Sequence, residues 1–185
     1  MKKAVFLDRD GVINRKPPEG EYVTRWEDLE LLPGAAEAIA ALVKAGFLVI
    51  VVSNQRCVAK GLLTVRELNS IHQRMREKLA TAGAVITEVY YCPHDTQPPC
   101  DCRKPAPGML LTAARNHEVD LAGSWMVGDS DTDVEAGKKA GCRTVRILKS
   151  GELAASGADM FALSLFDAVR QILPLTTPLE QVNAK

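Results

Sequence analysis

The sequence has 185 residues, 46% of them hydrophobic and 25% charged, which is the composition of a globular chain that can bury a core. Lysine plus arginine equals aspartate plus glutamate at 23 each, so no basic surplus is available to grip nucleic-acid phosphates. No apolar run of about 18 residues predicts a membrane span, and the first six residues do not resemble a secretory signal. We therefore expect a cytoplasmic protein without nucleic-acid or membrane partners.

Short apolar runs, typical of buried strands, alternate along the chain with segments of helical periodicity. In chain order, strands are expected at residues 4–7, 47–52, 85–91, 124–127 and 144–148. Helices are expected at residues 34–44, 65–82, 108–117, 131–141 and 165–173. Thr64 and Glu67 predict a capping box at the start of the second helix, and Asp131 and Ser164 are expected to cap the last two.

Strands that are apolar on both faces and alternate with helices predict an α/β fold, a Rossmann-like parallel sheet with helices on both faces. We expect one domain over residues 1–173, acting as a monomer. Prolines and polar residues predict a loose tail over residues 174–185. Ligands of such sheets bind beyond the carboxyl ends of the strands, so polar residues at those positions are the candidates for function.

Polar residues do gather directly after the expected strands. Asp8 and Asp10 follow the first strand two residues apart, so their carboxylates can serve together as metal ligand, nucleophile or proton carrier. Ser53 follows the second strand, Asp129 follows the fourth, and the cation Lys104 ends the loop after the third. Singly, each has an ordinary alternative: a capping or turn aspartate, a serine at a strand end, or a solvated lysine. Their shared location predicts an active site.

The order of these signals is more specific than any one of them. Asp-x-Asp-Gly at residues 8–11, the serine at 53, the lysine at 104 and Gly-Asp-x-x-x-Asp at 128–133 all stand in register with the expected elements. Over residues 3–150 this pattern resembles the haloacid dehalogenase superfamily of phosphatases. The resemblance implies a magnesium-dependent phosphomonoesterase that acts on a small phosphorylated metabolite.

The resemblance also implies a role for each matching residue. Asp8 would attack phosphorus and become a transient aspartyl-phosphate, while Asp10 would act first as general acid and then as general base. Mg²⁺ would be held by the carboxylates of Asp8 and Asp129 and by the backbone carbonyl of Asp10. Ser53 and Lys104 would stabilise the phosphoryl oxygens as negative charge spreads over them.

A further aspartate, Asp133, lies one helical turn beyond Asp129 and is expected to orient Lys104 or to hold the loop rather than to bind metal. The proposed chemistry also has an independent electrostatic reason. A dianionic phosphate repels a carboxylate nucleophile, so the positive charges of the metal and of Lys104 are needed to make the approach tolerable.

Four potential metal ligands crowd the loop that follows the third strand. The set consists of Cys92, His94, Cys100 and Cys102. Its tight Cys₃His spacing predicts a closed tetrahedral zinc site, the alternative being scattered free thiols. Because the protein would fill all four coordination positions, the zinc is expected to be structural. It is expected to order a loop over residues 92–104 and so to aim Lys104 at the phosphate. Cys57 and Cys142 are expected to be ordinary small apolar residues.

The motifs Asp-x-Asp-Gly-Val-Ile-Asn, Cys-Pro-His and Cys-Asp-Cys-Arg-Lys-Pro together resemble one subgroup, the D-glycero-D-manno-heptose 1,7-bisphosphate phosphatases and the related histidinol-phosphate phosphatases. The resemblance implies that no large cap domain is present and that the zinc loop and the loop after the first strand cover the site. Ser-Asn-Gln at 53–55 is similar to the heptose enzymes. Pro-Pro at 17–18 and the five residues between His94 and Cys100 are similar to the histidinol-phosphate enzymes.

The expected substrate is the heptose bisphosphate, with histidinol phosphate as the alternative. A bisphosphate needs cations for its second phosphate, whereas the ammonium of histidinol phosphate needs a carboxylate such as Glu19 or Glu21. Loop charges of this kind are commonly just solvated surface. The residues expected to bind substrate are Asn54, Gln55, Arg56, Arg103, Lys16 and Lys60.

Two other functions fit the sequence less well. A zinc-stabilised binding module that has lost catalysis would carry damage at one of the catalytic positions, and all of them are intact. A DNA 3′-phosphatase would use similar chemistry but would need a basic surplus that this chain lacks.

Overall fold

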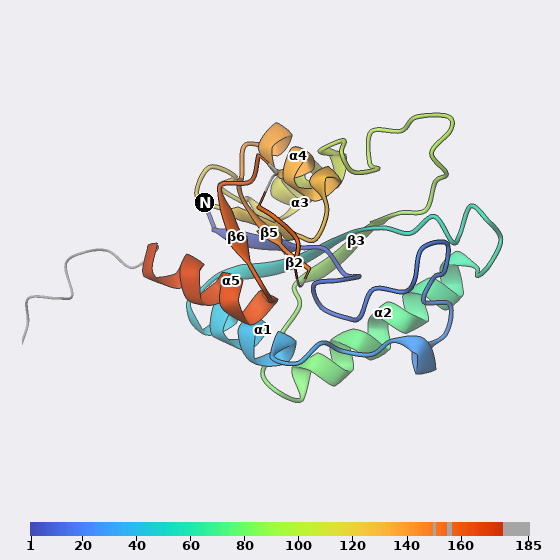
Figure 1. Ribbon diagram of the computed structural model, residues 1–185, viewed down its shortest axis with the longest axis horizontal. Coiled ribbons are helices and arrows are strands. Elements are labelled where there is room, and N and C mark those ends of the chain that lie inside the picture. The colour runs from blue at the N-terminus through green and yellow to red at the C-terminus, as the bar shows by residue number, and fades with distance from the viewer. Residues whose placement is uncertain (150, 155–156, 176–185) are drawn as a thin grey trace, which may run out of the picture.

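The computed structural model of the chain describes residues 1–149, 151–154 and 157–175. At its centre lies a parallel sheet in the strand order β3-β2-β1-β4-β5-β6 (Figure 1). The strands are β1 (Ala4–Leu7), β2 (Leu48–Asn54), β3 (Glu88–Cys92), β4 (Trp125–Gly128), β5 (Arg143–Ile147) and β6 (Met160–Ala162). The predicted α/β class with a Rossmann-like parallel sheet is confirmed.

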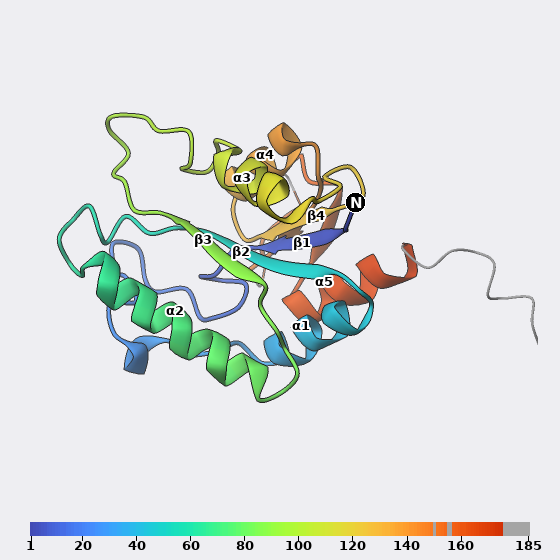
Figure 2. The ribbon, with the colours of Figure 1, turned by 180° about the vertical axis from the view of Figure 1, so that it is seen from behind.

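Helices cover both faces of this sheet. In the described residues they are α1 (Ala35–Lys44), α2 (Val65–Ala80), α3 (Gly108–His117), α4 (Asp131–Ala140) and α5 (Leu165–Ile172). The views from both sides show α1, α2 and α5 on one face and α3 and α4 on the other (Figures 1 and 2). Strand side chains alternate to match, since Val5 and Leu7 join the core beneath α1 and α2 while Phe6 joins the core beneath α3 and α4.

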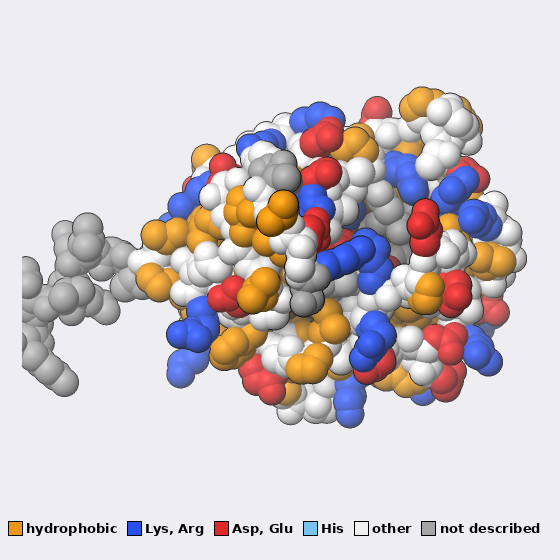
Figure 3. Space-filling view, in the orientation of Figure 1, with side chains coloured by type: hydrophobic (Ala, Val, Ile, Leu, Met, Phe, Trp, Pro, Cys, Tyr) orange, Lys and Arg blue, Asp and Glu red, His pale blue; other side chains and the backbone are white. Residues whose placement is uncertain are grey.

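The connecting segments add little structure of their own. Between β1 and α1 the only helical turn in the described residues is η1 (Trp26–Asp28), and no separate cap domain is present in the part of the chain that the structure covers. None of its helices is both long enough and apolar enough to cross a membrane. On the face in Figure 3, acidic and basic side chains are intermingled rather than gathered into one charged patch.

The strand order places the carboxyl ends of β1 and β4 together. From β1 the chain first adds β2 and β3 on one side, and it then returns to add β4, β5 and β6 on the other side. Such a switch point is where ligands bind in doubly wound sheets. Asp8 directly follows β1, and its N–H donates to the carbonyl of Val127 in β4 at 3.0 Å. Asp129 follows β4, so the fold brings these two carboxylates to the same place.

Several element boundaries differ from the sequence prediction, and each difference has a structural reason. β2 continues through Ser53 instead of ending before it, because β3 pairs alongside as far as Asn54 and Cys92. β3 begins only at Glu88, since Val85 is half exposed and the register with β2 starts at Glu88. The last helices begin as expected to within one residue.

Capping and the end of the chain show further differences. The cap of α4 is Ser130 rather than Asp131, because the Ser130 side chain and Asp133 form a reciprocal capping box. The capping box of Thr64 and Glu67 at α2 is confirmed. Strand β6 was not predicted. The first residues of the expected tail belong to η2 (Leu173–Leu175), and residues 176–185 lie outside the described part.

Candidate active site

A cavity of about 520 Å³ opens where β1, β2 and β4 end. Its lining includes all the residues that the sequence grouped as catalytic or magnesium-binding: Asp8, Asp10, Ser53, Lys104 and Asp129. Residues 16–23, from the loop after β1, form another part of the wall. Side chains from four distant stretches of sequence therefore face one space at the edge of the sheet.

Lys104 is the fixed cation of this site and is almost completely buried. Its Nζ donates to Asp8 Oδ1 at 2.8 Å and to the carbonyl of Val52 at 2.8 Å, and it lies 2.5 Å from Asp133 Oδ1. Burial alone would lower the pKa of Lys104, but the attraction of Asp133 and Asp8 outweighs it and raises that pKa. The ammonium therefore stays charged, and its pair with Asp133 is a contact through which Asp133 can orient it.

Asp8 lies in a less favourable environment for its charge. Burial raises the pKa of Asp8 to about 7, even though Lys104 acts in the opposite direction. The neighbouring carboxylates Asp133 and Asp10 raise it further. A carboxylate with a disfavoured charge beside a fixed ammonium is suited to attack an electrophile or to accept a metal cation.

Carboxylate oxygens of Asp8, Asp129 and Asp133 lie within 4.8 Å of one another and fit a hard divalent cation. The position already attracts positive charge, since Lys16 Nζ lies 2.9 Å and 2.7 Å from the two oxygens of Asp129. Gly11 has φ +96° and allows the Asp129 carboxylate to lie close to the loop after β1, because a Cβ at residue 11 would collide with that carboxylate. The donors are all oxygens, the set that Mg²⁺ prefers.

Asp10 is held by a set of donors on its own side of the cavity. The buried guanidinium of Arg9 donates to both carboxylate oxygens, with Nη2 at 3.0 Å and 2.9 Å and Nε at 3.2 Å. Asn14 and Gln55 donate to the same carboxylate at 2.9 Å and 3.1 Å. Burial would raise the pKa of Asp10, but Arg9 and these hydrogen bonds hold it below its usual value. The resting carboxylate is therefore ionised.

Two residues expected to bind substrate also hold side chains that are expected to be catalytic. Asn54 clamps the backbone of Lys104, accepting from its N–H at 3.0 Å and donating to its carbonyl at 3.0 Å. The Gln55 amide donates to Ser53 Oγ at 2.8 Å as well as to Asp10. Both residues line the cavity, and these contacts fix the directions of Lys104 and Ser53.

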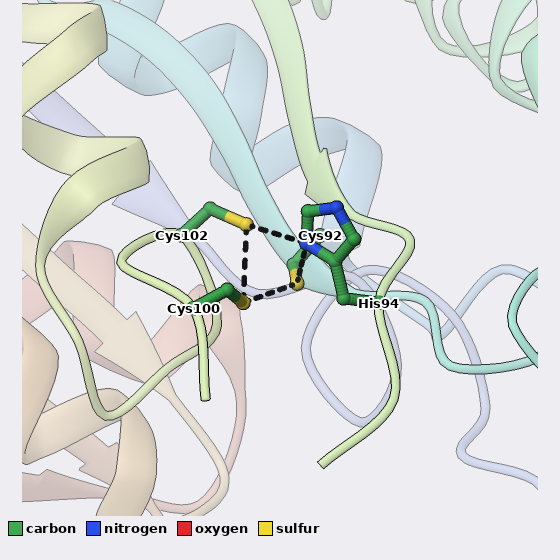
Figure 4. Close-up of side chains that lie close together, drawn as sticks. All are labelled: Cys92, His94, Cys100 and Cys102. Atoms are coloured by element: carbon green, nitrogen blue, oxygen red, sulfur yellow. Dashed lines mark hydrogen bonds between the residues drawn. The ribbon is translucent and has the colours of Figure 1, made fainter. Parts of the chain in front are cut away.

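The Cys₃His set forms a compact cluster next to this site (Figure 4). Sulfur–sulfur and sulfur–Nδ1 distances of 3.2 to 3.6 Å join its members: Cys92, His94, Cys100 and Cys102. Zinc–ligand bonds of about 2.0–2.3 Å place tetrahedral ligand atoms roughly 3.5–3.8 Å apart, so the cluster fits one zinc ion. None of the five cysteines, all of which lie within the described residues, forms a disulfide. Lys104 lies two residues beyond Cys102, which joins the cluster to the cavity.

The other residues expected to bind substrate lie in different places. Lys16 lines the cavity, but its ammonium is directed at Asp129. Arg56, Lys60 and Arg103 are not among the lining residues. Arg56 pairs with Asp95 at 2.6 Å, the Lys60 ammonium lies 5.0 Å from the Tyr22 ring centre, and Arg103 donates to the His94 carbonyl at 3.3 Å.

Sequence reasoning missed Lys149, Arg9 and His72. Lys149 lines the cavity from the segment after β5, where an exposed lysine gives no signal in the sequence. Arg9 stands between the two motif aspartates, which hints at a role, and its Nη1 lies 3.1 Å from His72 Nε2 on α2. Nothing in the sequence links His72 to that motif.

Comparisons with known proteins agree with this geometry. The HAD-hydrolase-like family matches residues 101–160. A D-glycero-beta-D-manno-heptose-1,7-bisphosphate 7-phosphatase of Pseudomonas putida is 41% identical, over 81% of this chain and 84% of its own length. A D-glycero-D-manno-heptose-1,7-bisphosphate 7-phosphatase of Thermosynechococcus vestitus is 38% identical, over 96% and 98%.

A solved structure is also similar. It is the D,D-heptose 1.7-bisphosphate phosphatase of B. bronchiseptica complexed with magnesium and phosphate, which matches with a TM-score of 0.85 and 35% identity, over 94% of this chain and 99% of that one. The parallel sheet, the clustered carboxylates and the identity across most of the length all indicate the same family. The chain belongs to the heptose 1,7-bisphosphate 7-phosphatase family of haloacid dehalogenase-like hydrolases.

Proposed function

We propose that the protein removes the 7-phosphate of D-glycero-D-manno-heptose 1,7-bisphosphate. The observation that carries this proposal is the identity to relatives of that name over most of the chain, together with a complete set of phosphatase residues around one cavity. The intact set also argues against a binding module that has lost catalysis. A monomeric state and a cytoplasmic location stay predictions.

The proposed mechanism assigns each step to a residue of the cavity. Asp8 attacks phosphorus as the bond to the leaving oxygen breaks. Asp10, which is ionised at rest and must first take up a proton from solvent, gives that proton to the departing alkoxide, and an aspartyl-phosphate is left at Asp8. Asp10, now a carboxylate, takes a proton from the water that attacks the intermediate and releases phosphate. Ser53 Oγ and Lys104 Nζ donate to the phosphoryl oxygens, where negative charge builds up.

Magnesium fits the oxygen donors of this site. The carboxylates of Asp8 and Asp129 and the backbone carbonyl of Asp10 would hold it, and it would supply positive charge that offsets the repulsion between phosphate and nucleophile. Asp133, paired with Lys104, is left to orient that lysine. We expect turnover to require added Mg²⁺.

Substrate choice depends on charges in the cavity wall. Lys149 and Lys16, the latter paired with Asp129, line the cavity and supply positive charge for a second phosphate, while Glu19 and Glu21 line the same space and suit an ammonium. The proposal is tested by comparing kcat/KM for heptose 1,7-bisphosphate and histidinol phosphate at one Mg²⁺ concentration. We expect kcat/KM to be at least tenfold higher for the bisphosphate, because a tenfold ratio is about what one additional charged contact contributes. Preference for histidinol phosphate would overturn the substrate and leave the chemistry in place.

We further propose that the cysteine loop binds one structural zinc ion. The four ligand atoms form a closed set, and the Arg103 guanidinium donates to the His94 carbonyl, so the loop connects directly to the segment that carries Lys104. Zinc would thus hold that segment in place, because the bonds of a structural site stabilise the fold around it.

Metal analysis of purified protein should find about one zinc per chain. The variant Cys102→Ser should lose the zinc, melt at a lower temperature and lose activity, because the segment before Lys104 is no longer tied down. Cys142→Ser is the matched control, since this buried thiol lies outside the cluster, and it should keep its zinc. Wild-type protein that folds without zinc would contradict the proposal.

A further inference from the structure

The buried side of the Asp10 carboxylate is connected to helix α2 through Arg9. The loop that follows β1 runs beside α2 in both views (Figures 1 and 2), and Arg9 Nη1 lies 3.1 Å from His72 Nε2. The Arg9 and His72 side chains are almost completely buried. The other nitrogens of the guanidinium, Nε and Nη2, donate to Asp10.

The direction of the Arg9–His72 hydrogen bond follows from chemistry. A guanidinium has only donors, so Nε2 of His72 must accept, and the proton of the neutral ring lies on Nδ1. Burial, with Arg9 nearby, lowers the pKa of His72 to about 3, so the ring stays neutral and keeps its acceptor. Among the described residues His72 Nδ1 has no hydrogen-bond partner, so the ring makes its polar contact through Nε2.

The imidazole is also held firmly in place. Its ring packs against Tyr91 of β3 with centroids 5.4 Å apart, and the Tyr91 hydroxyl donates to Asn69 of α2 at 2.8 Å. Helix and strand thus fix the ring, the ring fixes one end of the guanidinium, and the guanidinium fixes Asp10. Packing alone does not require His72 to contact Arg9, the buried cation that donates to Asp10.

We infer that His72 is a positioning residue for the general acid: it accepts from Arg9 so that Arg9 presents its remaining donors to Asp10. The inference rests on the proposed role of Asp10 in protonating the leaving group. Small displacements of a catalytic group cost large factors in rate. Loss of the His72 acceptor should therefore impair the step that needs Asp10 and spare chemistry that does not.

Leaving groups of different basicity separate this role from simple packing. The alkoxide of a sugar phosphate must be protonated as it departs, whereas p-nitrophenolate is stable without a proton. The ratio kcat/KM reports the steps up to formation of the aspartyl-phosphate. A misplaced Asp10 should therefore lower kcat/KM for the sugar phosphate only. We expect His72→Phe to lower kcat/KM for heptose 1,7-bisphosphate by about 10- to 100-fold and that for p-nitrophenyl phosphate by less than about threefold.

Companion variants make the result decisive. His72→Gln, which restores a neutral acceptor, should recover most of the loss. Met75→Ala, which removes only apolar contacts one turn further along α2, should lower the melting temperature and change both substrates equally. If His72→Phe does not fold, His72→Leu replaces it in the same comparison.

Equal losses with both substrates, no loss with the bisphosphate, or a His72→Gln variant as impaired as His72→Phe would overturn the inference. Asp10→Asn separates this failure from a failure of the proposed function. If Asp10→Asn also affects both substrates equally, the general-acid role of Asp10 is wrong. If it selectively impairs the bisphosphate while the His72 variants do not, only the positioning role is wrong.

Discussion

Replacing Asp8 with asparagine is expected to abolish turnover of every phosphate ester, with kcat falling by about 10⁴-fold or more, as when other enzymes lose their nucleophile. An amide oxygen does not form the acyl phosphate. The fold should tolerate the change, since burial raises the pKa of Asp8 to about 7 despite the nearby Lys104, which shows that the fold disfavours the Asp8 charge. The melting temperature should stay near that of the wild type.

The measurement is kcat with heptose 1,7-bisphosphate and with p-nitrophenyl phosphate, combined with thermal unfolding of the same preparations. Asp28→Asn is a matched control and should leave kcat unchanged, because within the described part of the chain this exposed carboxylate pairs only with Arg25. A folded Asp8→Asn protein that keeps more than about one hundredth of the wild-type kcat would refute the nucleophile assignment.

The central strands were predictable because β1, β4 and all but the two ends of β2 are buried, and burial on both faces leaves continuous apolar runs in the sequence. β6 escaped prediction because three residues at the edge of a sheet are too few to show a period. The end of β2 was misplaced for a different reason. Ser53 is polar, but as a strand residue it pairs with Tyr91 of β3, and a partner strand more than thirty positions away in the chain cannot be inferred from local sequence.

The residues of the candidate site likewise fall into those that the sequence reveals and those that only the fold brings together. Asp8, Asp10 and Asp129 could be grouped because each stands where a parallel strand ends, a position that the sequence reveals. The contacts of Arg56 could not be foreseen, since the cysteine loop brings Asp95 to it across 39 positions. His72 lies on a helix with an ordinary amphipathic pattern. Only the packing of α2 against the loop after β1 makes it a neighbour of Arg9.

Removing the charge of Lys104 is expected to cost both stability and activity. In Lys104→Met the carboxylates of Asp8 and Asp133 remain buried without their shared cation. Breaking a buried ion pair from one side typically costs about 3–5 kcal/mol, and we expect a loss of that size in the free energy of unfolding measured with urea. kcat/KM should fall by about 10²–10³-fold, because the phosphoryl oxygens lose a preorganised donor.

The two losses have separate causes, and a second substitution distinguishes them. Adding Asp133→Asn to Lys104→Met removes one of the two charges left without a cation, while the amide oxygen keeps the hydrogen bonds from Ser130 at the start of α4. Part of the stability should therefore return while the activity does not. Lys139→Met is the surface control and should change stability by less than about 0.5 kcal/mol, since in the residues that the structure describes this exposed lysine pairs only with Glu135 one turn away. If the double variant regained activity, the role of Lys104 would be to balance charge in the fold and not to bind phosphate. If it regained no stability, the carboxylates would not be the source of the cost.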